Sequence, residues 1–132
     1  RHGQGAAVRA GLDAASSGGA PTPFLVVNAD LPCVTPRDLH TLAGAVPEHG
    51  LVVVPAADGT TNALGLSDES QFEPLYGPGS AARFVARSGS RVLDAPNLVD
   101  DVDTADDLAR LESRLGPRTR SVLIAIRREA AA

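Results

Sequence analysis

The 132-residue sequence predicts a single α/β domain with a mostly parallel β-sheet. Two apolar runs, Phe24 to Asn28 and Leu51 to Pro55, lack the polar alternation of half-exposed strands and are typical of strands covered on both faces. A helix pattern separates them, from Pro36 to about Val46. Such alternation of strands and helices favours a parallel sheet with right-handed crossovers.

The first element is a helix that precedes both strands. Val8, Leu12 and Ala15 recur at helical spacing and predict a helix from Gln4 to Ala15. The glycine- and proline-rich stretch "SSGGAP" then ends it. The strand from Phe24 to Asn28 follows directly.

The second helix has an unusually clear start. Thr35 and Asp38 have the spacing of a capping box, and Pro36 occupies the position at which proline best begins a helix. The apolar face of this helix consists of Leu39, Leu42, Ala43 and Val46.

Beyond the second strand the signals are shorter. A third strand is expected at Ala63 to Leu66, a helix from Ser80 to about Arg87, and a strand near Val92. Thr104 and Asp107 repeat the capping-box spacing. They predict a helix whose face is formed by Leu108, Leu111 and Leu115 and which Gly116-Pro117 closes, before a helical tail.

Composition narrows the classes of partner. The formal net charge is −4 and the chain has no lysine, which argues against a nucleic-acid partner. No apolar run is long enough to span a bilayer, so a cytoplasmic protein without a membrane partner is expected. The single Cys33 fits a reducing compartment and is interpreted as a small packed side chain. The sequence contains no signal for the oligomeric state.

Asp30 follows the first strand closely. Open α/β sheets bind ligands beyond the carboxyl ends of their strands, so Asp30 is a candidate ligand for Mg²⁺. Mg²⁺ needs only one or two carboxylates when substrate phosphates and water complete its shell. The alternative is that Asp30 forms only a local turn before Leu31-Pro32.

The densest acidic cluster, "DDVD", offers the second metal ligand. It comprises Asp100, Asp101 and Asp103 and precedes the helix that begins near Thr104. Carboxylates also favour helix starts through the helix dipole, and for Asp101 and Asp103 the two explanations stay open. Asp30 and Asp103 are the pair expected to share one ion.

Two loops between these carboxylates could bind an anion. Small and hydroxyl side chains from Gly59 to Asn62 favour exposed backbone N–H groups, although an ordinary turn is the alternative. In "GPGS", Gly77 allows close backbone approach and Ser80 can cap a helix that faces a phosphate. The alternative there is a loop with a capped helix.

Four motifs in order, "NADLP", "DGTTNAL", "FEPLYGPGSAAR" and "DVDTADDL", resemble one family closely. The chain is similar to 2-phospho-L-lactate and phosphoenolpyruvate guanylyltransferases, which serve biosynthesis of the deazaflavin coenzyme F-420. The resemblance runs from the first helix to "LGPRTRSVL". It implies a three-layer, Rossmann-like nucleotidyltransferase domain. Phe84 stands where this family usually has histidine.

The resemblance also implies a reaction and its residues. Mg²⁺ would join GTP to a phosphorylated three-carbon acid, either phosphoenolpyruvate or 2-phospho-L-lactate, with release of pyrophosphate. Asp30 and Asp103 would be the catalytic metal ligands, with Asp101 a less favoured choice. Thr61, Gly77 and Ser80 would contact the acid.

The family places a further strand and a basic nucleotide loop ahead of the region seen in this chain. Residues 1–132 are therefore expected to be one nucleotidyltransferase-like domain without its N-terminal segment. Two alternatives stay open: a catalytically inert fragment or binding module of this fold, and a nucleotidyltransferase with another acceptor.

Overall fold

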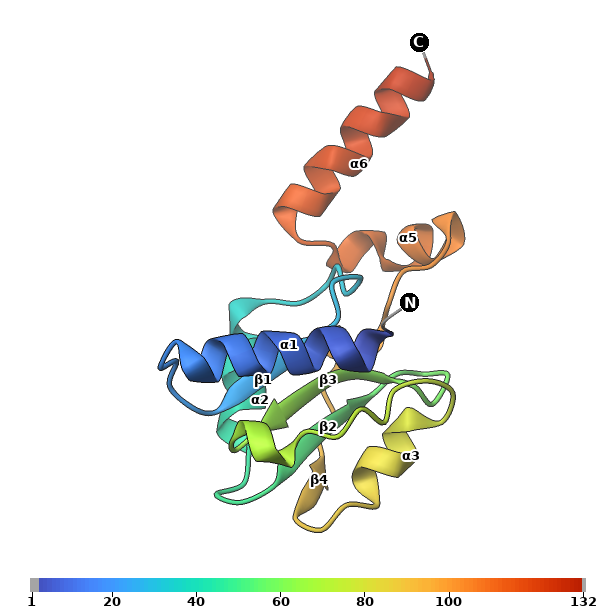
Figure 1. Ribbon diagram of the computed structural model, residues 1–132. Helices are drawn as coiled ribbons and strands as arrows, with labels where there is room; N and C mark the ends of the chain where they lie inside the picture. The colour runs from blue at the N-terminus through green and yellow to red at the C-terminus, as the bar shows by residue number, and fades with distance from the viewer. Residues whose placement is uncertain (1–2, 132) are drawn as a thin grey trace.

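The computed structural model describes residues 3–131. They form one four-stranded sheet with helices packed around it (Figure 1). The strand order is β1-β3-β2-β4. The elements are α1 (Gln4–Ser17), β1 (Phe24–Val27), α2 (Pro36–Ala45), β2 (Leu51–Pro55), β3 (Thr61–Leu66), the 3₁₀ turn η1 (Glu69–Gln71), α3 (Ser80–Val85), β4 (Ser90–Val92), α4 (Pro96–Val99), α5 (Ala105–Leu111), the 3₁₀ turn η2 (Glu112–Arg114) and α6 (Pro117–Ala130).

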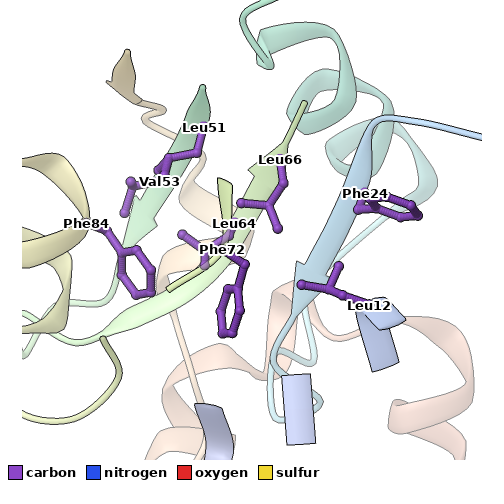
Figure 2. Packing of buried hydrophobic residues seen from close by; sticks show 8 residues of the cluster. All are labelled: Leu12, Phe24, Leu51, Val53, Leu64, Leu66, Phe72 and Phe84. Atoms are coloured by element: carbon purple, nitrogen blue, oxygen red, sulfur yellow. The ribbon is translucent and has the colours of Figure 1, made fainter. Parts of the chain in front are cut away.

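Apolar side chains cover both faces of the sheet, so the sheet is the middle of three layers. Val52 and Val54 of β2 belong to a cluster that includes Leu42 of α2. Alternate residues of β2 point to the opposite face, towards α1 and α3 (Figure 2). The cluster on that face comprises Leu12, Phe24, Leu51, Val53, Leu64, Leu66, Phe72 and Phe84. The predicted three-layer α/β fold is confirmed.

The sheet is mixed, so its predicted mostly parallel character is correct only in part. β3 pairs antiparallel with both β1 and β2, whereas β2 pairs in parallel with β4. β1, β2 and β4 therefore share one direction, which β3 opposes. The connection between β2 and β3 is too short for a parallel crossover, which takes a dozen or more residues. Asp58-Gly59, with Gly59 at φ +83°, forms the turn of this hairpin.

Both predicted capping boxes are present. The hydroxyls of Thr35 and Thr104 accept the backbone N–H groups of Asp38 and Asp107, whose carboxylates accept the threonine N–H groups in return. Several boundaries were predicted wrongly. β3 begins at Thr61 instead of Ala63, and α3 ends at Val85 instead of about Arg87. α5 ends at Leu111, and the following 3₁₀ turn separates it from α6. Within residues 3–131, no helix is long and apolar enough to cross a membrane.

Two glycines let β2 and β4 begin side by side. Gly50 has φ +130°, and a Cβ there would stand 2.3 Å from the carbonyl oxygen of Gly89. Gly89 has φ +74°, and its own Cβ would lie 2.9 Å from the carbonyl oxygen of His49. Because the neighbouring atoms are backbone, no side-chain rotation relieves the contact. The parallel pairing of Leu51 with Ser90 follows directly from this junction.

We expect Gly50→Ala to lower the free energy of unfolding by about 1–3 kcal/mol or more, because it adds both strain and overlap. Gly44→Ala is the control: Gly44 lies in α2, and a methyl group added there would meet no neighbouring side chain or loop within 4 Å. That change should stabilise the chain by up to about 1 kcal/mol through helix propensity. Urea unfolding measures the free energy of unfolding of both variants. If both substitutions stabilised the chain, or both destabilised it, the proposed requirement for glycine at position 50 would be contradicted.

Candidate active site

A backbone hydrogen bond fixes Asp30 beside the acidic segment that precedes α5. Asp30 lies in the turn after β1, and its carbonyl accepts the Val102 N–H at 3.1 Å. Asp101 and Asp103 are the two neighbours of Val102 in the chain. The structure thus sets the turn that contains Asp30 beside the segment that contains Asp103, the two residues predicted to share an ion.

Negative charge is concentrated at this edge. Burial raises the pKa of Asp101, and the charges of Asp103, Asp30 and Asp58 raise it further. Asp58 comes from the β2–β3 turn, so three separate segments contribute carboxylates. Such a field favours a bound cation. Within residues 3–131, no three His, Cys, Asp or Glu side chains gather closely enough to hold a metal by themselves.

Asp100 has a different role from its neighbours. It accepts hydrogen bonds from Arg110 at 3.0 Å and from Arg114 at 2.5 Å. The bond from Arg114, followed by that from Arg110, lowers the pKa of Asp100. Asp100 therefore anchors the acidic segment before α5 to α5 itself and to the turn after it. Asp101 and Asp103 form no such ion pair among the described residues.

Thr61 and Ser80, two of the predicted substrate contacts, touch each other. Their hydroxyl oxygens are 3.0 Å apart, and only 2% of Thr61 and 0% of Ser80 is exposed. The carbonyl of Gly77, the third predicted contact, accepts the Ser80 N–H at 3.0 Å. The two hydroxyls hold the start of β3 against the start of α3, and in this form neither is open to solvent.

Gly77 lines a surface pocket of about 440 Å³ between the start of α1 and the segment from Pro74 to Gly77. A larger hollow of about 560 Å³ lies near Gly89, where β4 begins, and it contains none of the predicted site residues. Of these two pockets, the one at Gly77 is lined by a predicted site residue.

Two asparagines, which sequence reasoning did not single out, connect Thr61 with the acidic edge. Asn28 donates through its side chain to the Thr61 carbonyl at 3.3 Å and through its backbone to the Asn62 carbonyl at 3.0 Å. Asn62 is buried and donates to the Val99 carbonyl at 2.9 Å. A polar residue inside the apolar run of β3 was the available signal, because buried polar groups need partners.

Arg83 is another residue whose role the sequence did not reveal. Its guanidinium donates to the carbonyls of Leu75, Tyr76 and Pro78 at distances from 2.7 to 3.4 Å. These bonds fix the loop that contains Gly77, whose φ of +112° requires glycine. An arginine shortly after a glycine-rich loop was the only signal for this clamp.

Phe84 and Cys33 both serve packing. Phe84, at the position where histidine is usual in the resembled family, is fully buried with its ring 5.4 Å from that of Tyr76. Burial raises the pKa of Tyr76 to about 12. Cys33 is buried too, and burial raises the pKa of its thiol, so the prediction of a packed cysteine is confirmed.

The three-layer fold, with polar loops gathered where β1 and β2 end, is that of an α/β domain which binds ligands beyond the ends of its strands, and the family match makes it a nucleotidyltransferase type of domain. The chain belongs to the MobA-like NTP transferase domain family, whose match covers residues 1–123. A solved structure from Desulfovibrio desulfuricans, described as a nucleotide-diphospho-sugar transferase, superposes with a TM-score of 0.64. The match covers 84% of this chain and 51% of the solved chain. Because the two sequences are only 20% identical, the likeness shows the fold alone.

Curated relatives are closer in sequence. The chain is 41% identical to the phosphoenolpyruvate guanylyltransferase of Sanguibacter keddieii, over 92% of this chain and 46% of that protein. It is 39% identical to the enzyme of the same name from Sphaerobacter thermophilus, over 79% and 53% respectively. The corresponding protein of Rhodococcus opacus is 37% identical over 98% and 55%. The chain thus spans about half the length of these relatives, and the predicted family resemblance is confirmed.

We expect the Thr61–Ser80 hydrogen bond to appear as strong coupling in a double-mutant cycle. Ser80→Ala or Thr61→Val alone leaves one buried hydroxyl without its partner, at a cost of about 1–3 kcal/mol. The double variant removes both hydroxyls and should cost about 0.5–3 kcal/mol less than the sum of the single changes. Urea unfolding of the wild type, the two single variants and the double variant gives the coupling free energy. Additive effects would refute the predicted coupling between the two hydroxyls.

The start of α5 should lose stability in acid. The Thr104 hydroxyl, then Arg110 and the Asp103 N–H, lower the pKa of Asp107 from its usual 3.8 to about 2. Stability from a lowered carboxylate pKa is complete above the unfolded value and is lost as pH falls through the folded value. The stability advantage of wild type over Asp107→Asn should therefore shrink between about pH 4 and pH 2. Urea unfolding at a series of pH values measures the difference in free energy of unfolding between the two proteins. A difference that does not change with pH would contradict the prediction.

Proposed function

We propose that this chain forms the acceptor and metal-binding part of a guanylyltransferase. It would transfer GMP from GTP to phosphoenolpyruvate or 2-phospho-L-lactate, release pyrophosphate and serve coenzyme F-420 biosynthesis. The names of the curated relatives support the reaction class. One observation supports the proposal most: the hydrogen bond from the Val102 N–H to the Asp30 carbonyl, which joins the Asp30 turn to the acidic segment containing Asp103.

The proposed reaction is a displacement at phosphorus. A phosphate oxygen of the acid attacks the α-phosphorus of GTP and forms a new P–O–P bridge. The bond from the α-phosphorus to the oxygen shared with the β-phosphate breaks, and pyrophosphate leaves with the electron pair. Such a transfer needs alignment of the reactants and neutralisation of charge, and little covalent help from the protein.

The donor set at the acidic edge fits Mg²⁺. Asp30 and Asp103 would hold the ion, and both offer the oxygen ligands that Mg²⁺ prefers. Bound there, Mg²⁺ would neutralise charge on the nucleotide phosphates. Burial is the main cause of the raised pKa of Asp101, and the repulsion from nearby carboxylates that raises it further is the kind that a divalent cation relieves. Asp101 is the alternative second ligand.

The acid would bind next to this edge, at Thr61, Gly77 and Ser80. Gly77 borders an open pocket, and Arg83 holds the backbone around it. Thr61 and Ser80 now satisfy each other, so their hydroxyls would exchange that bond for one to the acid. Substitutions at these two positions should therefore alter the KM for the acid more than kcat.

Pyrophosphate release by the full-length protein, from GTP, Mg²⁺ and each phosphorylated three-carbon acid, tests the proposal. We expect release only when an acceptor is present, and Asp30→Asn or Asp103→Asn should reduce the rate by about 10²-fold or more. Asp106→Asn, at an exposed position in the first turn of α5, is the matched control and should retain activity. Circular dichroism checks that the variants fold.

The outcomes separate the alternatives. No release with phosphoenolpyruvate, 2-phospho-L-lactate or 3-phosphoglycerate would refute the proposed reaction. GTP binding in calorimetry without turnover would favour a binding module. Loss of activity in Asp101→Asn, with Asp103→Asn active, would move the second metal ligand to Asp101.

A further inference from the structure

Helix α6 extends away from the sheet, and none of its residues is buried (Figure 1). One side of it is attached to the rest of the chain: Leu123 packs against the cluster of Cys33, Leu111 and Leu115, and Arg127 pairs with Glu112. An isolated helix of this length is only marginally stable in water. The remaining surface of α6 therefore needs explanation.

An apolar stripe runs along the free surface of α6. It consists of Thr119, Val122, Ile126 and Ala130, which fall within about 80° of one another around a helix of 3.6 residues per turn. The two large members are well exposed, Val122 by 59% and Ile126 by 57%. Spacings of three and four residues are those of helices that pack along a seam.

Two opposite charges flank this stripe on the same side. Arg118 and Glu129 lie at opposite ends of α6 but only about 20° apart around its axis. Neither forms a salt bridge with any part of the chain that the structure describes. Together they give the flank a positive end and a negative end.

We infer that α6 packs antiparallel against α6 of a second copy of this chain, around a two-fold axis. Arg118 and Glu129 are equally distant from a point between Leu123 and Ile124, and Val122 and Ile126 are centred almost at the same point. A two-fold axis there sets Arg118 of each copy against Glu129 of the other and buries both stripes. A parallel pair would instead set like charges together.

The groove beside α6 suits the same arrangement. Between α5 and α6 lies a pocket of about 370 Å³, lined mainly by apolar side chains such as Leu108, Val122 and Ile126. In the antiparallel register, the end of the second α6 passes over this groove. Its Ile126 would fill the space beside Leu108. This inference does not rest on the proposed function.

Sedimentation velocity over a range of micromolar concentrations tests the pairing. We expect a reversible two-chain species for the wild type and a single-chain species for Ile126→Asp. Ile124→Asp is the matched control, because Ile124 is exposed on the opposite side of α6 and the same substitution there should leave the dimer intact.

A charge swap tests the register independently of the apolar stripe. Arg118→Glu and Glu129→Arg each suit the dipole of an isolated α6, so neither should unfold the helix. Each should weaken dimerisation by about tenfold, because two attractive pairs become repulsive. The double variant restores opposite charges and should regain wild-type affinity.

Four results would overturn the inference: a wild type that stays single-chain, association that survives Ile126→Asp, equal loss in Ile124→Asp, or no recovery in the double variant. Circular dichroism of each variant checks the helix. If Ile126→Asp disrupts α6 itself, the charge variants still test the pairing, because they leave the helix folded.

Discussion

The placement of β3 between β1 and β2 is the constraint on which the rest of the structure depends. All six residues of β3 are buried, and the strand pairs along both edges. Because β3 runs against its neighbours, its first residues lie where β1 and β2 end. Thr61 and Asn62 can therefore meet Asn28 there. A parallel strand in the same place would carry Thr61 to the opposite end of the sheet.

The arginines of the chain leave this edge negative. Arg110 and Arg114 bind Asp100, and Arg83 binds backbone carbonyls. Among the described residues, no salt bridge reaches Asp30, Asp101 or Asp103. Because these arginines are engaged elsewhere, the three carboxylates keep their negative charge without a basic partner in the described part of the chain.

Local signals in the sequence predicted the helices well, because capping boxes and proline positions depend on neighbouring residues. Thr35 and Thr104 each begin a helix as expected. Strand order could not be predicted in the same way, since pairing joins distant segments. An ordinary turn was considered between the second and third strands, but their antiparallel pairing was not predicted. Asp30 and Asp103 were paired from their positions, one after a strand and one before a helix, and the resemblance to known enzymes favoured the same pair. The Asn62 and Arg83 contacts depend on tertiary structure and could not be read from spacing.

The pocket beside β1 marks a side of the sheet at which another extended segment can join. Within residues 3–131, β1 pairs only with β3, and a pocket of about 350 Å³ follows its other side between α1 and the strand. Backbone N–H and C=O groups along that side can accept an extended segment as an added strand. Pro23, which has no N–H to donate, limits the length of that edge at Phe24.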